Sequence, residues 1–202
     1  MSQPLQKRTR LAPEQKLEER CVILEDVIKA IIPIYSGKTA TENQKQLLET
    51  MIGAAIWYLP QSLEFWTGMI SREAIRSFHP RNRKTVPRLV AEHQHPRKVA
   101  AEELLTMDWN NHSRRGEVLL KLYLERYGRF NYVTPRENKM LVAFQKYAVF
   151  EDPVKAYGDA GVELIPLTPD QLSRVKKRSK ATIEKLVGPY PCGPSKTTPA
   201  PS

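Results

Sequence analysis

The chain has 202 residues, of which 41% are hydrophobic and 27% charged, a balance typical of a soluble globular protein. No apolar run approaches the roughly 18 residues that a membrane span needs, and no apolar segment follows the basic N-terminal residues, so neither a membrane partner nor a secretory signal is predicted. The net charge of +10, with only two cysteines, indicates a cytoplasmic protein with a polyanionic partner, most often nucleic acid.

The N-terminal part of the sequence predicts a flexible basic arm at residues 1–12, followed by a long helix. From Pro13 onward, apolar residues recur every three or four positions as far as Ile31, which places them on one face of a helix. Pro33 is expected to end that helix, because proline lacks the N–H that continues the hydrogen-bond ladder.

A second helix is predicted directly after the first. Thr41 with Gln44 is a capping box that opens it, and Pro60 closes it. We expect the helices of residues 13–68 to pack as an antiparallel pair. Residues 13–59 are then a candidate surface for a protein partner or for self-association.

Prolines interrupt the helical periodicity in the middle of the chain. Before them, a short helix is expected over residues 68–78, with Ser71 as its cap. The sequence RLVAEH, residues 88–93, is the best candidate for a strand. Pro96 suits the first turn of a helix over residues 97–105.

Two further elements follow in the second half of the sequence. A helix is expected over about residues 114–127, with Gly128 terminating it. Residues 130–133 suit a short strand. The sequence TPRE, residues 134–137, combines a cap, a proline at the first helical position and an acid three residues after the cap, and predicts a helix start.

The C-terminal part predicts a short helix after Asp152 and a strand within residues 161–167. Thr168 and Pro169, with Gln171 three residues after Thr168, are expected to begin a last basic helix. From residue 188 the chain is rich in proline, serine and threonine, as in disordered tails. The predicted fold class is α+β and mostly helical, with a domain over residues 69–187 that contains a small two-stranded element embedded among helices.

The sequence AEHQHP carries the candidate chemistry. It places Glu92 and His93 at the end of the strand predicted at residues 88–93. If that strand pairs with the strand at residues 130–133, His93 faces the start of the helix that carries Glu137 and Asn138. A neutral imidazole can accept a proton near neutral pH.

These residues resemble the HNH (His-Me finger, ββα-metal) endonucleases: AEHQHP is similar to their first motif, and YVTPRENK to the strand and helix that follow. The resemblance implies a DNA endonuclease in which His93 is the general base. It also implies that a divalent metal, Mg²⁺ or Mn²⁺, is bound by Glu92 and Asn138, with Glu137 as the alternate ligand. Such hard cations prefer oxygen ligands.

A basic segment surrounds the motif. Cations there would hold the nucleic-acid backbone without reading its sequence. The candidate residues are Arg81, Arg83, Lys84, Arg88, His95, Arg97 and Lys98. A second basic cluster lies within residues 174–185.

Each of these residues also has an ordinary structural interpretation. Glu137 is a capping residue in many helices, Asn138 suits a solvent-facing position, and His95 suits a solvated loop. Three functions therefore remain open: a metal-dependent endonuclease, a non-catalytic nucleic-acid-binding protein, and a helical interaction or regulatory protein.

Overall fold

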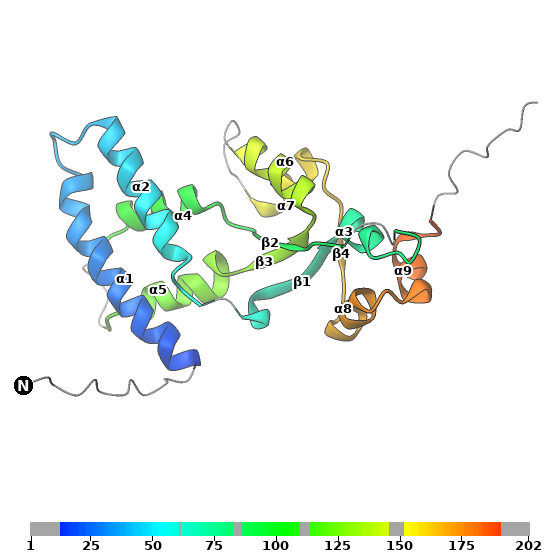
Figure 1. The fold of residues 1–202 in the computed structure, drawn as a ribbon. Coiled ribbons are helices and arrows are strands. Elements are labelled where there is room, and N and C mark those ends of the chain that lie inside the picture. Colours follow the sequence, from blue (N-terminus) through cyan, green and yellow to red (C-terminus); the bar gives the residue numbers. More distant parts are fainter. Residues whose placement is uncertain (1–12, 61, 83–85, 110–113, 146–151, 191–202) are drawn as a thin grey trace, which may run out of the picture. The chain divides into compact units, whose positions relative to one another are not determined.

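The computed structural model describes residues 13–60, 62–82, 86–109, 114–145 and 152–190 (Figure 1). The arm predicted at residues 1–12 and the part of the predicted tail beyond residue 190 lie outside the described residues.

The chain divides into two compact units. Unit 1 comprises residues 1–66 and 93–130, and unit 2 comprises residues 67–92 and 131–202. Residues 93–130 therefore group with the N-terminal helices, although the sequence suggested a continuous domain over 69–187.

Unit 1 is helical. Its elements are α1 (Pro13–Tyr35), α2 (Glu42–Ile56), the 3₁₀ turn η1 (Leu63–Phe65), α4 (Arg97–Thr106), α5 (Glu117–Leu122) and the π-helical turn η2 (Tyr123–Tyr127). The first two helices run antiparallel, as predicted, α4 packs against both, and α5 packs against α1 (Figure 1).

The apolar stripe of α1 forms part of the core of unit 1. Leu17, Cys21, Leu24 and Ile28 are all buried, as their spacing predicted. The expected end at Pro33 was two residues short, because α1 continues to Tyr35. A proline close to the C-terminus of a helix removes only one hydrogen bond of the last turns, which the packing of α1 outweighs.

The capping box at the start of α2 is confirmed. The Gln44 N–H donates to Thr41 Oγ1 at 3.3 Å, and the Thr41 N–H donates to Gln44 Oε1 at 2.9 Å. Two N–H groups that lack partners within the helix are thereby satisfied by neighbouring residues.

A buried carboxylate fixes the start of α5 on α1. Glu25 is 1% exposed and accepts hydrogen bonds from the Gly116 N–H at 2.7 Å and from Lys29 Nζ at 2.6 Å. Gly116 has a φ of 77°, and a Cβ there would lie 2.6 Å from Cγ2 of Val22. Glycine is required at this position both for its backbone conformation and for its close approach to α1.

Unit 2 contains the sheet. Its elements are β1 (Trp66–Ser71), α3 (Arg72–Ser77), β2 (Val90–His93), β3 (Phe130–Val133), α6 (Pro135–Gln145), α7 (Pro153–Asp159), β4 (Leu164–Pro166), α8 (Pro169–Lys176) and α9 (Lys180–Val187). The division between the units falls at the ends of three strands, so Trp66, His93 and Phe130 are counted with unit 1. The strand order is β2-β3-β1-β4. The mostly helical α+β class is confirmed, but the sheet formed by the described residues has four strands rather than two.

The strand missed by sequence reasoning is β1, which was expected to form the start of a short helix. It pairs antiparallel with β4, with Ile70 opposite Ile165. Gly68 has a φ of 84°, and its carbonyl accepts the Leu167 N–H at 2.7 Å. A strand interrupted by glycine shows no clear alternation of apolar and polar residues, so the period-2 signal was absent. The predicted Ser71 cap of α3 is confirmed.

Helices α6 and α7 pack together over one apolar cluster of unit 2. Val133, Leu141, Tyr157 and Val162 are its buried members. They come from β3, α6, α7 and the turn before β4, so this cluster joins the sheet to both helices.

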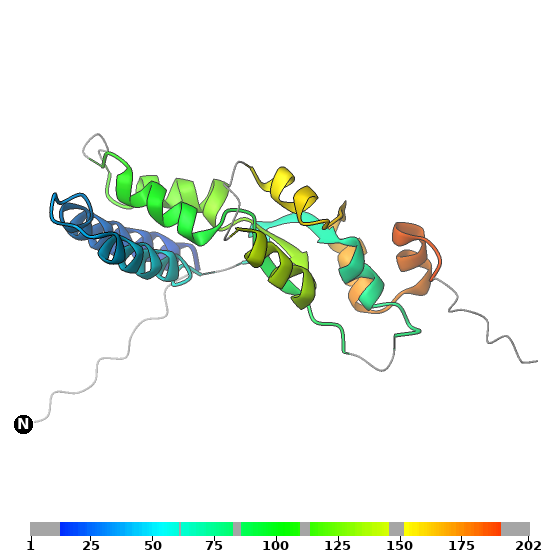
Figure 2. The ribbon, with the colours of Figure 1, turned by 90° about the horizontal axis from the view of Figure 1, so that it is seen from above.

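Helix α9 packs against α3 and α8, and it lies beside α3 in both ribbon views (Figure 1 and Figure 2). Arg72 contributes to this packing. Its guanidinium forms two hydrogen bonds with the Glu163 carboxylate, at 2.5 and 2.6 Å, and donates a third to the Val187 carbonyl at 3.3 Å.

The basic C-terminal helix predicted after Thr168 is two helices. The capping box of Thr168 with Gln171 is confirmed at the start of α8. The chain then turns at Arg178, which has a φ of 59°, before α9 begins. This break gives α9 its own direction and an N-terminus of its own.

Candidate functional site

The residues predicted to carry the chemistry fall in both units. His93, His95, Arg97 and Lys98 belong to unit 1, and Arg81, Arg88, Glu92, Glu137 and Asn138 belong to unit 2. Arg83 and Lys84 lie outside the described residues. The predicted strand pairing is present, because β2 and β3 are neighbours in the sheet, and α6 begins two residues after β3.

His93 is held in a defined orientation within unit 1. Its Nδ1 lies 3.0 Å from the carbonyl oxygen of Tyr127, and its ring packs edge-on against Trp57 with centroids 4.3 Å apart. A carbonyl oxygen only accepts hydrogen bonds, so Nδ1 carries the proton and Nε2 carries the lone pair. This is the tautomer in which Nε2 can act as a base.

The surroundings of His93 also favour its neutral form. Burial lowers the pKa of His93, and the positive charge of Arg97 lowers it further, while the hydrogen bond with Tyr127 acts in the opposite direction. The neutral imidazole is the form that accepts a proton.

The carbonyl that orients His93 belongs to Tyr127, the last residue of the π-helical turn. The Gly128 N–H donates to the Tyr123 carbonyl at 2.8 Å, a bond that spans five residues. A Cβ on Gly128 would lie 2.8 Å from that same carbonyl oxygen, so the turn requires glycine. Turns of this type are often found at functional sites.

His95 is buried rather than part of a solvated loop. Its Nε2 lies 3.4 Å from Oε2 of Glu103, which also accepts the Tyr127 hydroxyl at 2.8 Å; the other carboxylate oxygen accepts Arg126 Nη2 at 3.0 Å. Burial lowers the pKa of His95, Glu103 opposes that shift and Arg126 adds to it. The network accounts for the buried position of His95 without a phosphate, and its contact with nucleic acid stays a prediction.

Arg97 and Lys98, both expected to contact nucleic acid, are exposed and interact within unit 1. The Arg97 guanidinium lies 4.4 Å from the centre of the Trp57 ring, and Lys98 Nζ lies 3.7 Å from a Glu49 carboxylate oxygen. An exposed cation with such contacts remains able to meet a polyanion, but the contacts account for its position without one.

The Glu92 carboxylate lies inside unit 2. It is 6% exposed and accepts a hydrogen bond from the Tyr157 hydroxyl. Burial is the main cause that raises the pKa of Tyr157, and the charge of Glu92 raises it further, so the phenol stays protonated and can donate. Sequence reasoning missed Tyr157, since no local pattern connects α7 to β2.

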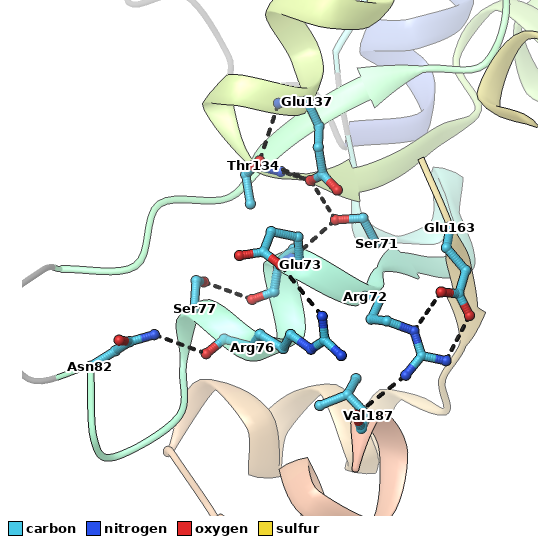
Figure 3. A network of polar contacts seen from close by, with 11 residues as sticks. Ser71, Arg72, Glu73, Arg76, Ser77, Asn82, Thr134, Glu137, Glu163 and Val187 are labelled. Atoms are coloured by element: carbon cyan, nitrogen blue, oxygen red, sulfur yellow. Dashed lines mark hydrogen bonds and ion pairs between the residues drawn. The ribbon is translucent and has the colours of Figure 1, made fainter. Parts of the chain in front are cut away.

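Glu137 caps α6 and also reaches β1. Its Oε2 accepts hydrogen bonds from the Thr134 N–H and hydroxyl, both at 2.8 Å, and from the Ser71 hydroxyl at 2.6 Å (Figure 3). The Glu137 N–H in turn donates to Thr134 Oγ1 at 3.2 Å. The structural interpretation of Glu137 as a capping residue is thereby confirmed, and the Ser71 contact extends it.

The two carboxylates expected as metal ligands already accept hydrogen bonds from protein donors. Glu92 binds Tyr157, Glu137 binds Thr134 and Ser71, and Asn138 is half-buried on α6. Within the described ranges, no group of three or more histidine, cysteine, aspartate or glutamate side chains is arranged to hold a metal ion.

The positive charge is concentrated in unit 2. Counted over the sequence, unit 2 has seventeen lysines and arginines against nine acidic residues, a net charge of +8, whereas unit 1 has a net charge of +2. The exposed cations of unit 2 include Arg81, Arg88, Arg174, Lys177 and Lys180. The total charge of the chain could not show this division.

Helices α1 and α2 also carry exposed apolar side chains. Ile23, Val27 and Ile34 on α1 are between 43% and 59% exposed, and Leu47 and Met51 on α2 are at least 50% exposed. On each helix their spacing places them on one face, distinct from the buried stripe.

Comparison of the chain with family models, with curated proteins and with solved structures finds no match. None of the helices in the described ranges combines the length and the apolar character that crossing a membrane requires.

Proposed function

We propose that this protein binds nucleic acid, with DNA as the first candidate, and that unit 2 supplies most of the affinity. The observation that carries this proposal is the net charge of +8 in unit 2 against +2 in unit 1. Lysine and arginine side chains that neutralise phosphates release condensed counterions, and this release gives affinity without sequence preference.

The test is to titrate fluorescent 30-base-pair DNA duplexes of unrelated sequence with the protein. Fluorescence anisotropy measures the binding at several salt concentrations. We expect similar affinities for all sequences and a steep fall of the affinity as the salt concentration rises. In a plot of the logarithm of the association constant against the logarithm of the salt concentration, each neutralised phosphate should contribute about −0.9 to the slope.

A pair of charge-removing variants locates the binding unit. Arg88→Gln with Lys177→Gln removes two exposed cations of unit 2, and Lys16→Gln with Lys38→Gln removes two exposed cations of unit 1. The unit 2 pair should weaken binding more and reduce the salt slope by up to about 2, roughly 1 for each lost phosphate contact. Absence of binding at low salt, or an equal loss from both pairs, contradicts the proposal.

A second candidate is the metal-dependent endonuclease that the HNH resemblance implies. The orientation of His93 favours it, because the Tyr127 carbonyl holds Nδ1 protonated, and in this tautomer Nε2 carries the lone pair that can accept a proton. The adjacency of β2 and β3, followed by α6, is the order of elements that this resemblance requires. The engagement of Glu92 and Glu137 with internal donors favours binding without hydrolysis.

A plasmid-nicking assay separates the two candidates. Wild type and His93→Ala are compared with Mg²⁺, with Mn²⁺ and with a chelator. Metal-dependent nicking that His93→Ala abolishes, with the fold and DNA binding retained, supports hydrolysis. Salt-sensitive binding by both proteins without nicking supports the binding protein alone.

Self-association through α1 and α2 is a separate proposal, supported by their exposed apolar side chains. Sedimentation equilibrium is the test: wild type should show a concentration-dependent dimer, and Ile23→Lys with Ile34→Lys should stay monomeric. A monomer at all concentrations in wild type contradicts it.

A further inference from the structure

A basic pocket lies in unit 2 where the turn after α3 meets the start of α9. Its volume is about 330 Å³, and His79, Pro80, Arg81 and Lys180 line it. That volume is at the lower end for small-molecule sites, which span about 300–1,000 Å³. Neither of its two cations comes from the AEHQHP segment, and Lys180 lies about 100 residues beyond Arg81 in the sequence.

The position of Arg81 is set by a buried histidine. His79 is 2% exposed, and its Nδ1 accepts the Arg81 N–H at 3.3 Å. Its Nε2 lies 3.5 Å from a carboxylate oxygen of Glu184, and its ring stacks on Tyr190 with centroids 4.7 Å apart. The imidazole thus joins the turn, α9 and the chain after α9.

Asn82 holds the other side of the same turn. Its Nδ2 donates to the Arg76 carbonyl at 3.2 Å (Figure 3), its N–H donates to the His79 carbonyl at 2.8 Å, and its Oδ1 accepts the Tyr190 hydroxyl at 2.8 Å. The turn that presents Arg81 is therefore ordered by several bonds before any ligand arrives, which lowers the entropic cost of binding.

The second cation is placed where the local electrostatics disfavour it. Lys180 is the first residue of α9. All residues of α9 are described, and its first turn contains no acidic residue. Ser179, the N-cap, makes no side-chain bond to the helix backbone. The N-terminus of a helix carries partial positive charge, so a lysine there is unfavourable unless an anion is near.

Glu184 offsets only part of this positive charge. It lies one turn further along α9, with a carboxylate oxygen 3.9 Å from Lys180 Nζ and 3.5 Å from His79. Arg81, which also lines the pocket, is exposed.

We infer that this pocket binds a phosphate group. The Arg81 guanidinium suits two parallel hydrogen bonds to phosphate oxygens, and the Lys180 ammonium supplies a point charge beside them. With the proposed function, on which this assignment rests, the phosphate belongs to a nucleic-acid backbone. The pocket is then the point at which the charged surface of unit 2 holds one phosphate in a defined position.

The first test uses inorganic phosphate alone. Amide chemical shifts of the full-length protein are followed by NMR during a titration with phosphate, against sodium chloride at equal ionic strength. We expect saturable shifts at the amides of Arg81, Lys180 and Ala181 with phosphate and not with chloride.

The variants for this test have a matched control. Arg81→Gln with Lys180→Gln should weaken phosphate binding at least about tenfold, because both charged hydrogen-bond donors of the pocket are lost. Arg136→Gln with Lys185→Gln makes the same change of charge at two exposed positions of α6 and α9 outside the pocket, and should leave phosphate binding within about twofold. Thermal melts of both variants verify that unit 2 stays folded.

A second experiment measures the binding of wild type and both variants to the DNA duplexes. It identifies whether the bound phosphate belongs to a nucleic acid or is free. Loss of both phosphate and DNA affinity in the pocket variant, beyond the control, supports the pocket as a backbone site. Phosphate binding without DNA binding by wild type overturns the proposed function and keeps the pocket as a site for a free phosphate. If wild type binds DNA, phosphate causes no chemical-shift changes and both variants lose DNA affinity equally, the pocket is not a phosphate site. The proposed function is then unaffected.

Discussion

The hydroxyl of Tyr157 donates a hydrogen bond to the Glu92 carboxylate, and both side chains are buried although 65 residues separate them in the sequence. A buried carboxylate is costly unless a donor satisfies it. Glu92 is therefore a structural part of unit 2, whatever chemistry the neighbouring His93 performs.

Removing the Tyr157 hydroxyl should destabilise the protein. Tyr157→Phe leaves the buried Glu92 carboxylate without this donor, and we expect the free energy of unfolding to fall by about 1–3 kcal/mol. Urea denaturation of Tyr157→Phe, Glu92→Gln and the double variant, together with wild type, forms a double-mutant cycle. The cycle gives the interaction free energy between the two side chains. Tyr58→Phe, which removes an exposed tyrosine hydroxyl, is the control. Additive single-variant effects would show that the two side chains do not interact.

Glu137 should contribute to stability through its bonds at the start of α6. Glu137→Ala removes the acceptor for Thr134 and for the buried Ser71 hydroxyl, and we expect a loss of about 1–3 kcal/mol. Glu73→Ala, in the exposed first turn of α3, is the matched control and should cost about 0.5 kcal/mol or less. Equal urea midpoints for the two variants would contradict the capping role.

Acidification should destabilise unit 1 through its two histidines. Burial lowers the pKa of both His93 and His95, so near and below the unfolded pKa of about 6.5 the unfolded chain binds more protons than the folded one. The contribution of the neutral histidines to the free energy of unfolding is fully present above about pH 6.5. It is lost as the pH falls from there to the lower pKa values that the histidines have in the folded protein.

Thermal melts between pH 7.5 and 5.5 measure this loss. The double variant His93→Gln with His95→Gln should show a smaller fall in Tm than wild type over the same range. Parallel pH profiles for the two proteins would show that these imidazoles are not the groups responsible.

The π-helical turn ends at Tyr127, whose carbonyl is the partner of His93, and it should not tolerate a side chain at Gly128. In Gly128→Ala the new Cβ would lie 2.8 Å from the Tyr123 carbonyl oxygen, so the turn must shift, and we expect a cost of about 1–3 kcal/mol. Gly158→Ala on α7 is the control, since a Cβ there would have no other atom within 4 Å and alanine favours a helix by up to about 1 kcal/mol. A Gly128→Ala protein as stable as wild type would contradict the requirement for glycine.

The same substitution tests the orientation of His93. A displaced Tyr127 carbonyl loses its bond to Nδ1, which should alter the imidazole nitrogen resonances of His93 in NMR spectra. Unchanged resonances, with the protein folded, would show that the turn does not set the tautomer.

The starts of several helices could be read from the sequence because they depend on near neighbours. Thr41 with Gln44, Thr134 with Glu137 and Thr168 with Gln171 each form the predicted box, with partners three residues apart. The buried stripe of α1 and the strands β2 and β3 were also predictable, since they follow from the periodicity of short segments.

Other features needed the tertiary structure. Tyr127 lies 34 residues from His93, Tyr157 lies 65 from Glu92, and Glu184 lies 105 from His79. The sequence by itself determined the helix caps, the buried stripe of α1 and the excess of positive charge. Tertiary structure decided which carboxylates are buried, which histidine is oriented and where two cations meet in a pocket, because those contacts form only when distant segments pack and exclude water from the polar groups between them.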